Sequence, residues 1–257
     1  MFGESSEARG GAAGRRPRGD VIAGESSDAR DAAAPARAAG RRPRDDVIAG
    51  LVLAAGGSRR LGRPKQLLPY GGATLLDHTL VTARACAFHQ LLCVLGGGAD
   101  GVREHVDLRD VEVVENAHFG DGCSSSIAAA LSAVDPRCEL LVLMLGDQPG
   151  VTPATVAALL AGRGDAPLAA CRYDDGRGHP LVFAREVFGE LAALHGDKGV
   201  WKLLDRRVDD VVDVPIPGPI PLDVDTWADY EAVLAGTADP RAAGATTAAD
   251  SSPGVRT

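Results

Sequence analysis

The chain has 257 residues, of which 45% are hydrophobic, enough for the core of one large domain or two small ones. Its formal net charge of −8 excludes a general nucleic-acid binder, whose surface carries an excess of basic side chains. Five well-separated cysteines without a C-x-x-C pair and the lack of any apolar run of ~18 residues favour a cytoplasmic protein with reduced thiols and no membrane segment.

Residues 1–46 contain an imperfect duplication and few large apolar side chains. GESSEAR recurs as GESSDAR, and AAGRRPRGDVIAG recurs as AAGRRPRDDVIAG. Such a composition buries too little surface to offset the entropy of ordering, so we expect a disordered extension. Arg41 and Arg42 could belong to a twin-arginine export signal. Asp45 and Asp46 lie between this pair and the apolar run that follows, which argues against such a signal. Residues 236–257 are rich in Ala, Thr, Ser and Pro and are also expected to be disordered, which leaves one domain at 47–235.

The first chemical motif, GGSRRLGRPK, directly follows an apolar strand predicted at residues 47–55. Its glycines let the backbone turn with positive φ, and their amides can form a concavity that binds anions. Arg60 and Lys65 add two charges that neutralise phosphate oxygens, so the pattern indicates a polyphosphate ligand. It is not a Walker loop, because no Gly-Lys-Ser or Gly-Lys-Thr occurs there. A metal ligand must therefore come from elsewhere.

Apolar strands then alternate with helical patterns. Further strands are predicted at residues 91–95, 111–115, 139–145, 167–171, 180–183 and 211–216. Helices are predicted at residues 74–88 with Thr74 as N-cap, 102–108, 124–134, from Pro153, and at 185–194, 200–206 and 225–234. This alternation predicts an α/β fold with a mostly parallel sheet, whose ligands lie at the carboxyl ends of the strands.

A second glycine pattern competes with the first. Gly96-x-Gly98-x-x-Gly101 follows a strand and mimics a dinucleotide fingerprint, with Glu115 placed to meet a ribose. The unit is shorter than the roughly 30 residues that such a βαβ motif needs. A nicotinamide-dependent oxidoreductase nevertheless stays as an alternative.

Two polar groups stand where strands and helices meet. Asp147 comes just past the apolar run ELLVLML, where a carboxylate can hold a magnesium ion that bridges nucleotide phosphates. An ordinary turn aspartate is the alternative reading. Three serines at residues 124–126 offer an N-cap together with hydroxyls that can face a ligand, although capping alone needs one serine.

The segment LAAGGSRRLGRPKQLLP resembles the signature of the MobA-like nucleotidyltransferases, Leu-Ala-Ala-Gly-x-Ser-x-Arg-Met-Gly-x-x-Lys, with Leu61 replacing Met. Its continuation GRPKQLLP looks most like the molybdopterin cytidylyltransferase branch. The later motifs follow in the family's order, including Gly-Asp-x-Pro at residues 146–149 and LDVDTWADY at 222–230, where Trp227 replaces Pro. The resemblance implies a three-layer αβα sandwich with a Rossmann-like sheet, of the nucleotide-diphospho-sugar transferase type.

The resemblance also implies roles for individual residues. Nucleotide binding falls on Leu53, Ala54, Ala55, Gly56, Gly57, Ser58, Gly62, Lys65, Gly96, Ser125 and Ser126. Catalysis falls on Arg60, Lys65 and Asp147. Metal binding falls on Asp147 and Asp225, with Asp223 in reserve, and acceptor binding on Gly178, His179 and Asp197.

The activity implied is Mg²⁺-dependent transfer of a nucleoside monophosphate to a phosphorylated acceptor, with release of pyrophosphate. The resemblance favours CTP, with GTP possible, and a molybdopterin-type acceptor, with a molybdoenzyme or its maturation chaperone as a further partner. A guanylyl or sugar-phosphate nucleotidyltransferase is the alternative within the family. A non-catalytic chaperone for a molybdoenzyme is another, against which the intact Lys65 and Asp147 argue.

Overall fold

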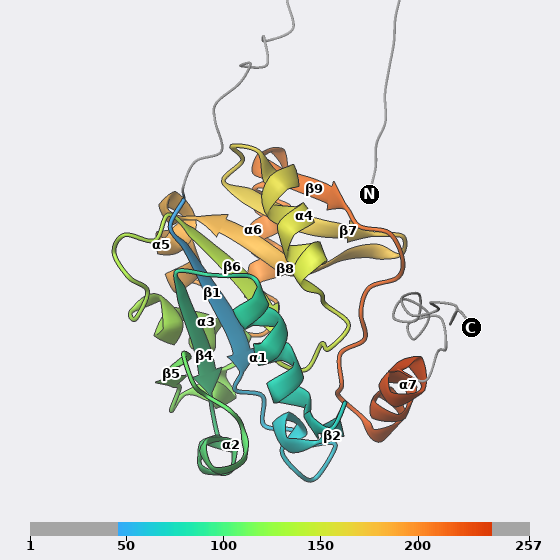
Figure 1. Cartoon of the computed structure of the whole chain (residues 1–257). Coiled ribbons are helices and arrows are strands. Elements are labelled where there is room, and N and C mark those ends of the chain that lie inside the picture. The colour runs from blue at the N-terminus through green and yellow to red at the C-terminus, as the bar shows by residue number, and fades with distance from the viewer. Residues whose placement is uncertain (1–45, 238–257) are drawn as a thin grey trace, which may run out of the picture. The chain divides into compact units, whose positions relative to one another are not determined.

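The computed structural model describes residues 46–237, and the predictions made for residues 1–45 and 238–257 lie outside them. The described part is built on a seven-stranded sheet of order β5-β4-β1-β6-β8-β7-β9, in which only β8 runs antiparallel to its neighbours (Figure 1). The strands are β1 (Ile48–Ala54), β4 (Gln90–Leu95), β5 (Glu112–Glu115), β6 (Leu140–Leu145), β7 (Leu168–Tyr173), β8 (Gly176–Ala184) and β9 (Val211–Pro215). Two short strands, β2 (Pro69–Tyr70) and β3 (Ala73–Thr74), form a separate hairpin.

Helices cover both faces of the sheet. They are α1 (Leu75–Ala85), α2 (Ala99–His105), α3 (Cys123–Leu131), α4 (Pro153–Arg163), α5 (Phe188–Ala192), α6 (Gly199–Arg206) and α7 (Trp227–Thr237). Buried side chains of α1, α2 and α4 share one apolar cluster with the sheet, and those of α3, α5 and α6 share the other. Side chains of β1 alternate between these clusters, as the period of a strand requires. The predicted three-layer α/β sandwich with a mostly parallel sheet is confirmed.

Local signals explain where several helices begin. The side chain of Thr74 accepts a hydrogen bond from the Asp77 amide, and Asp77 bonds back to Thr74 in a capping box. Thr152 caps α4, with proline in the first turn. Helix α2 begins three residues before the predicted position, and the predicted helix at 185–194 divides into a 3₁₀ turn and α5. The hairpin β2–β3 was not predicted, because two-residue strands carry no alternating pattern.

The described residues contain no helix long and apolar enough to cross a membrane.

A buried ion pair joins the start of the described chain to α4. Arg163 Nη2 lies 3.3 Å from Asp46 Oδ2, and Arg163 Nη1 donates to the Ala166 carbonyl at 2.6 Å. The two charged side chains are only 8% and 13% exposed. Removing one partner of a buried pair leaves the other charge without compensation. Asp46 is therefore a structural residue of the domain.

Deletion of residues 1–45 should leave the melting temperature and the turnover nearly unchanged, since the extension lacks the apolar side chains to join a core. In the same shortened chain, Asp46→Ala should lower the free energy of unfolding by about 3 kcal/mol. Thermal and urea denaturation of the full chain, the shortened chain and its Asp46→Ala variant measure the changes in stability. An activity assay of the full and shortened chains measures the turnover. A large loss of stability or turnover on deletion alone would show that the extension belongs to the domain.

Candidate active site

A cavity of about 450 Å³ opens at the carboxyl ends of β1 and β6. This volume lies within the range of sites for small ligands, about 300–1,000 Å³. The predicted site residues that line it are Leu53, Ala54, Ala55, Gly56, Gly57, Ser58, Arg60, Lys65, Ser126, Asp147, Asp197 and Asp225. The predicted residues outside its lining are Gly62, Gly96, Ser125, Gly178, His179 and Asp223. The structure thus gathers residues up to 172 positions apart in sequence, from Leu53 to Asp225, around one space.

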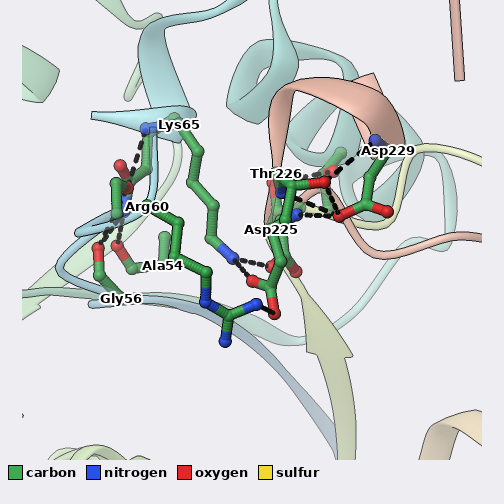
Figure 2. A network of polar contacts seen from close by, with 12 residues as sticks. Ala54, Gly56, Arg60, Lys65, Asp225, Thr226 and Asp229 are labelled. Carbon is green, nitrogen blue, oxygen red and sulfur yellow. Dashed lines mark hydrogen bonds and ion pairs between the residues drawn. The ribbon is translucent and has the colours of Figure 1, made fainter. Parts of the chain in front are cut away.

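The loop after β1 is held in shape by its own side chains. Ser58 adopts a positive φ of 47°, which is uncommon outside glycine, and its hydroxyl accepts the Lys65 amide at 2.9 Å. Buried Gln66 donates from Nε2 to the carbonyls of Ala54 at 2.5 Å and Gly56 at 3.2 Å. These bonds tie down two carbonyls of the loop and fix the position from which Lys65 extends (Figure 2).

Lys65 lies between two carboxylates. Its Nζ donates to Asp147 Oδ2 and, at 2.8 Å, to Asp225 Oδ1. Burial acts to lower the pKa of Lys65, but the charges and hydrogen bonds of the two aspartates outweigh it and raise the pKa above its ordinary value. Lys65 is therefore a full cation at neutral pH, held at the point where both carboxylates converge.

Asp225 and Asp223 differ in what they contact. Asp225 Oδ2 lies 3.5 Å from Arg60 Nη1, and Figure 2 shows Arg60 and Lys65 both directed toward Asp225. Asp223 forms no ion pair within residues 46–237, and burial, followed by the charge of Asp147, raises its pKa to about 6. Between them, the buried side chain of Val224 anchors the segment, and its amide donates to the Asp147 carbonyl at 3.1 Å. Asp225 is thus the residue of this segment that meets the cations.

The Asp147 and Asp225 side chains fit a hard divalent cation. Because oxygens of both contact the same ammonium nitrogen, both can reach one ion placed near that position. Among the described residues, no group of three or more His, Cys, Asp or Glu side chains gathers for a metal. A two-carboxylate site suits Mg²⁺, which keeps several waters and takes further oxygens from substrate phosphates.

The lining of the cavity also includes a hydroxyl, that of Ser126. Buried Asn116 donates from Nδ2 to the hydroxyl oxygens of Ser125 at 2.8 Å and Ser126 at 3.0 Å. Ser125 in turn donates within the protein, to the carbonyls of His118 or Gly122. Ser126 lines the cavity, and its hydroxyl proton has no acceptor among the residues at 46–237. Ser126 can therefore donate a hydrogen bond to a ligand.

Of the three predicted acceptor residues, only Asp197 lines the cavity. Its Oδ1 accepts the Cys123 amide at 3.0 Å. Burial, together with the charges of Asp197 and Asp147, raises the pKa of the Cys123 thiol to about 11, which favours the neutral thiol at this position. His179 packs edge-on against Trp201, and burial lowers its pKa to about 4. Neutral His179 and its neighbour Gly178 lie outside the cavity lining.

Protein atoms occupy the space beside the first glycine of the competing pattern, Gly96, and beside its neighbour Gly97. A Cβ at Gly96 would lie 2.5 Å from the Ala55 carbonyl oxygen, and one at Gly97 would lie 2.6 Å from the Phe119 ring. Glu115, the residue expected to meet a ribose, pairs with Arg103 at 2.7 Å. These glycines thus have a packing explanation that needs no dinucleotide.

Gln66 and Asn116 also hold the cavity wall, although neither was among the predicted site residues. Each is a polar side chain that is only 5% exposed, and each bonds to residues of the cavity wall. Gln66 directly follows the cationic loop and Asn116 directly follows β5. A polar residue at such a junction is a weak signal, because its burial depends on neighbours distant in sequence.

Comparison with known proteins places the chain in a family. Residues 50–211 match the model described as the MobA-like NTP transferase domain. Nicotine blue oxidoreductase of Paenarthrobacter nicotinovorans is 32% identical over 166 residues, which cover 61% of this chain and 81% of that protein. Bifunctional protein GlmU of Cellvibrio japonicus is 34% identical over 149 residues, and the match covers 56% of this chain but only 32% of GlmU.

Solved structures of mycobacterial proteins are more similar. The homologue of Mycobacterium tuberculosis Rv0371c from Mycobacterium sp. strain JC1 is 54% identical, with a TM-score of 0.69, and the match covers 74% of this chain and 96% of that one. Rv0371c of M. tuberculosis H37Rv in complex with manganese is 49% identical, with a TM-score of 0.65 and coverage of 74% and 98%.

Proposed function

The chain belongs to the MobA-like NTP transferase family and is a nucleotidyltransferase, and from that premise we propose that it transfers CMP from CTP to a molybdopterin-type acceptor. The cavity at the ends of β1 and β6 is the proposed active site. We further propose that the catalytic domain spans residues 47–235, with Asp46 joined to it by the ion pair to Arg163. We also propose that the enzyme acts in the cytoplasm, with a molybdoenzyme or its maturation chaperone as a partner.

One observation carries the proposal. Lys65, Asp147 and Asp225 come from three distant parts of the chain and meet at one point, beside a loop with a further cation, Arg60. A mixed cluster of this kind is poorly suited to a neutral ligand. It suits a triphosphate with its divalent metal, because the carboxylates take the metal and the cations take phosphate oxygens.

The chemistry requires little covalent participation from the protein. A phosphate of the acceptor is already an ionised nucleophile, so no strong general base is needed. Its oxygen attacks the α-phosphorus of the nucleotide, the bond from that phosphorus to the bridging oxygen breaks, and pyrophosphate leaves. Lys65 and Arg60 stabilise the charge that builds on the phosphate oxygens, while the fixed loop orients the triphosphate.

Asp147 and Asp225 would hold a Mg²⁺ ion, which when bound neutralises phosphate charge and assists departure of the leaving group. The manganese complex of Rv0371c supports a divalent metal in proteins of this similarity. Ser126, which also lines the cavity, would donate to an acceptor atom of the base, which cytosine and guanine both carry.

A second candidate function follows from the name of one relative, nicotine blue oxidoreductase. If this chain shared such an activity, it would need a site for an electron donor, and the Gly96–Gly101 pattern was the sequence's candidate for a nicotinamide nucleotide. Protein atoms crowd Gly96, the first glycine of that pattern, and Glu115 is paired with Arg103. We therefore propose nucleotidyl transfer first and keep the redox activity as a defined outcome of the test.

The test is a panel of CTP, GTP, ATP and UTP, each incubated with the protein, Mg²⁺ and either molybdopterin or a sugar 1-phosphate, with pyrophosphate release as the readout. We expect release with CTP and molybdopterin. Release with GTP in place of CTP would show that the enzyme uses guanine nucleotides. Release with the sugar phosphate in place of molybdopterin would show that the acceptor is a sugar phosphate. Oxidation of NADH or NADPH by a suitable dye, without pyrophosphate release in any pairing, would replace nucleotidyl transfer by the redox function.

A further inference from the structure

The side chain that completes the carboxylate pair is presented by an irregular segment. Asp225 precedes α7 and lies beyond residue 211, where the match to the family model ends. Its side chain is 48% exposed, whereas that of Asp147, at the end of the buried strand β6, is 16% exposed. Packing alone therefore fixes Asp225 less firmly than Asp147. Lys65 and Arg60 contact its carboxylate, and a separate restraint holds its backbone.

Asp229 supplies that restraint. Its Oδ2 accepts hydrogen bonds from the Thr226 amide at 2.7 Å, the Thr226 hydroxyl at 2.8 Å and the Asp225 amide at 3.2 Å. The Asp229 amide returns a bond to the Thr226 hydroxyl at 3.2 Å. Figure 2 shows Thr226 and Asp229 beside Asp225, with Asp229 on the side away from Lys65. One carboxylate oxygen thus holds the backbone of Asp225 as well as the cap of α7.

The geometry points to Asp229 as a positioning residue, which holds the backbone of Asp225 so that its carboxylate converges with Asp147 on one divalent cation. This inference rests on the proposed function in taking Asp225 as a metal ligand. Asp229 itself forms no ion pair within residues 46–237, so it acts through Asp225 and not by contact with a cation. Partners that orient metal ligands typically change metal affinity by 10- to 100-fold when removed.

The same chain contains a matched control. At the start of α1, Asp77 Oδ2 accepts the Thr74 amide at 3.1 Å and the Thr74 hydroxyl at 2.7 Å, and the Asp77 amide bonds back at 3.1 Å. This is the same Thr-x-x-Asp cap, but neither residue lines the cavity. Asp77 Oδ1 also accepts the Asp107 amide at 2.8 Å, so the Asp77 variant loses the helix cap and one further bond. Loss of a cap should therefore destabilise both variants, whereas loss of metal positioning should affect only Asp229.

The experiment measures Mn²⁺ binding to the nucleotide-free protein by electron paramagnetic resonance of the unbound ion. The proteins are wild type, Asp229→Ala, Asp77→Ala, Asp225→Asn and the double variant Asp225→Asn with Asp229→Ala. Melting temperatures are recorded in parallel. Asp229→Asn, which keeps the side-chain shape, replaces Asp229→Ala if the alanine variant does not fold.

We expect the Mn²⁺ dissociation constant to rise about 10-fold or more in Asp229→Ala and to change less than 2-fold in Asp77→Ala. Adding Asp229→Ala to Asp225→Asn should have no further effect on binding. If Asp225→Asn weakens binding while Asp229→Ala binds like wild type, the positioning role is refuted and the metal site stands. If Asp225→Asn itself binds like wild type, the metal assignment of the proposed function is wrong and the positioning role is refuted with it.

Discussion

Lys65→Ala should reduce nucleotidyl transfer by about 100-fold or more while the chain keeps its fold. The Lys65 amine is a full cation, only 12% exposed, and held by two carboxylates at the base of the cavity. A preorganised charge in such a site stabilises the transition state without reorganisation, and its loss typically costs about 3 kcal/mol or more. Steady-state pyrophosphate release at saturating nucleotide measures the effect, and circular dichroism verifies the fold.

Arg63→Ala is the control for this prediction. Arg63 is an exposed cation of the same loop, two residues from Lys65, and it lies outside the cavity lining. Its removal should change the rate by less than about 3-fold, since exposed charges far from the reacting atoms are screened. Activity of Lys65→Ala within a few-fold of wild type would show that the cationic loop is misassigned.

Asp147→Asn should have the second large effect, a loss of about 100-fold in turnover at a fixed low Mg²⁺ concentration. The carboxamide keeps the shape of the side chain but removes the charge, and Mg²⁺ prefers anionic oxygen ligands. More Mg²⁺ should therefore be needed for half-maximal rate, with little change in melting temperature. Rates measured across a series of Mg²⁺ concentrations give the concentration needed for half-maximal rate.

The other two aspartates give a ranking that tests the same prediction. Asp225→Asn should shift the Mg²⁺ requirement in the same direction, and Asp223→Asn should shift it less, because Asp223 forms no ion pair within residues 46–237. If Asp147→Asn leaves the Mg²⁺ dependence unchanged, the carboxylate at the end of β6 is not a metal ligand.

Much of this architecture could be predicted from sequence because its signals are local. The apolar runs of β1 and β6 identify buried strands, and parallel pairing brings their carboxyl ends together. That single rule predicts that Lys65 and Asp147, which follow these two strands, lie near one another. The capping residues Thr74 and Thr152 likewise mark helix starts through chemistry confined to one turn.

Other features could not be predicted, because they depend on contacts distant in sequence. The segment of Asp223 and Asp225 has no periodicity, so only the family resemblance favoured Asp225 over Asp223. The distant contact that places this segment is the bond from the Val224 amide to the Asp147 carbonyl. Gly96 belongs to a pattern that resembles a dinucleotide site, but Phe119, which is distant in sequence, packs against it. His179 stands in a family motif, yet it packs against Trp201 and does not line the cavity.

The central claim is that a metal-bound triphosphate reacts between Lys65, Asp147 and Asp225. A crystal structure of the protein with Mn²⁺ and a CTP analogue that cannot be cleaved at the α-phosphate tests it most directly. We predict an anomalous peak about 2 Å from oxygens of both Asp147 and Asp225. The Lys65 amine should have moved from the carboxylates to a phosphate oxygen. A metal bound elsewhere, or a triphosphate outside the loop at residues 56–65, would contradict the claim.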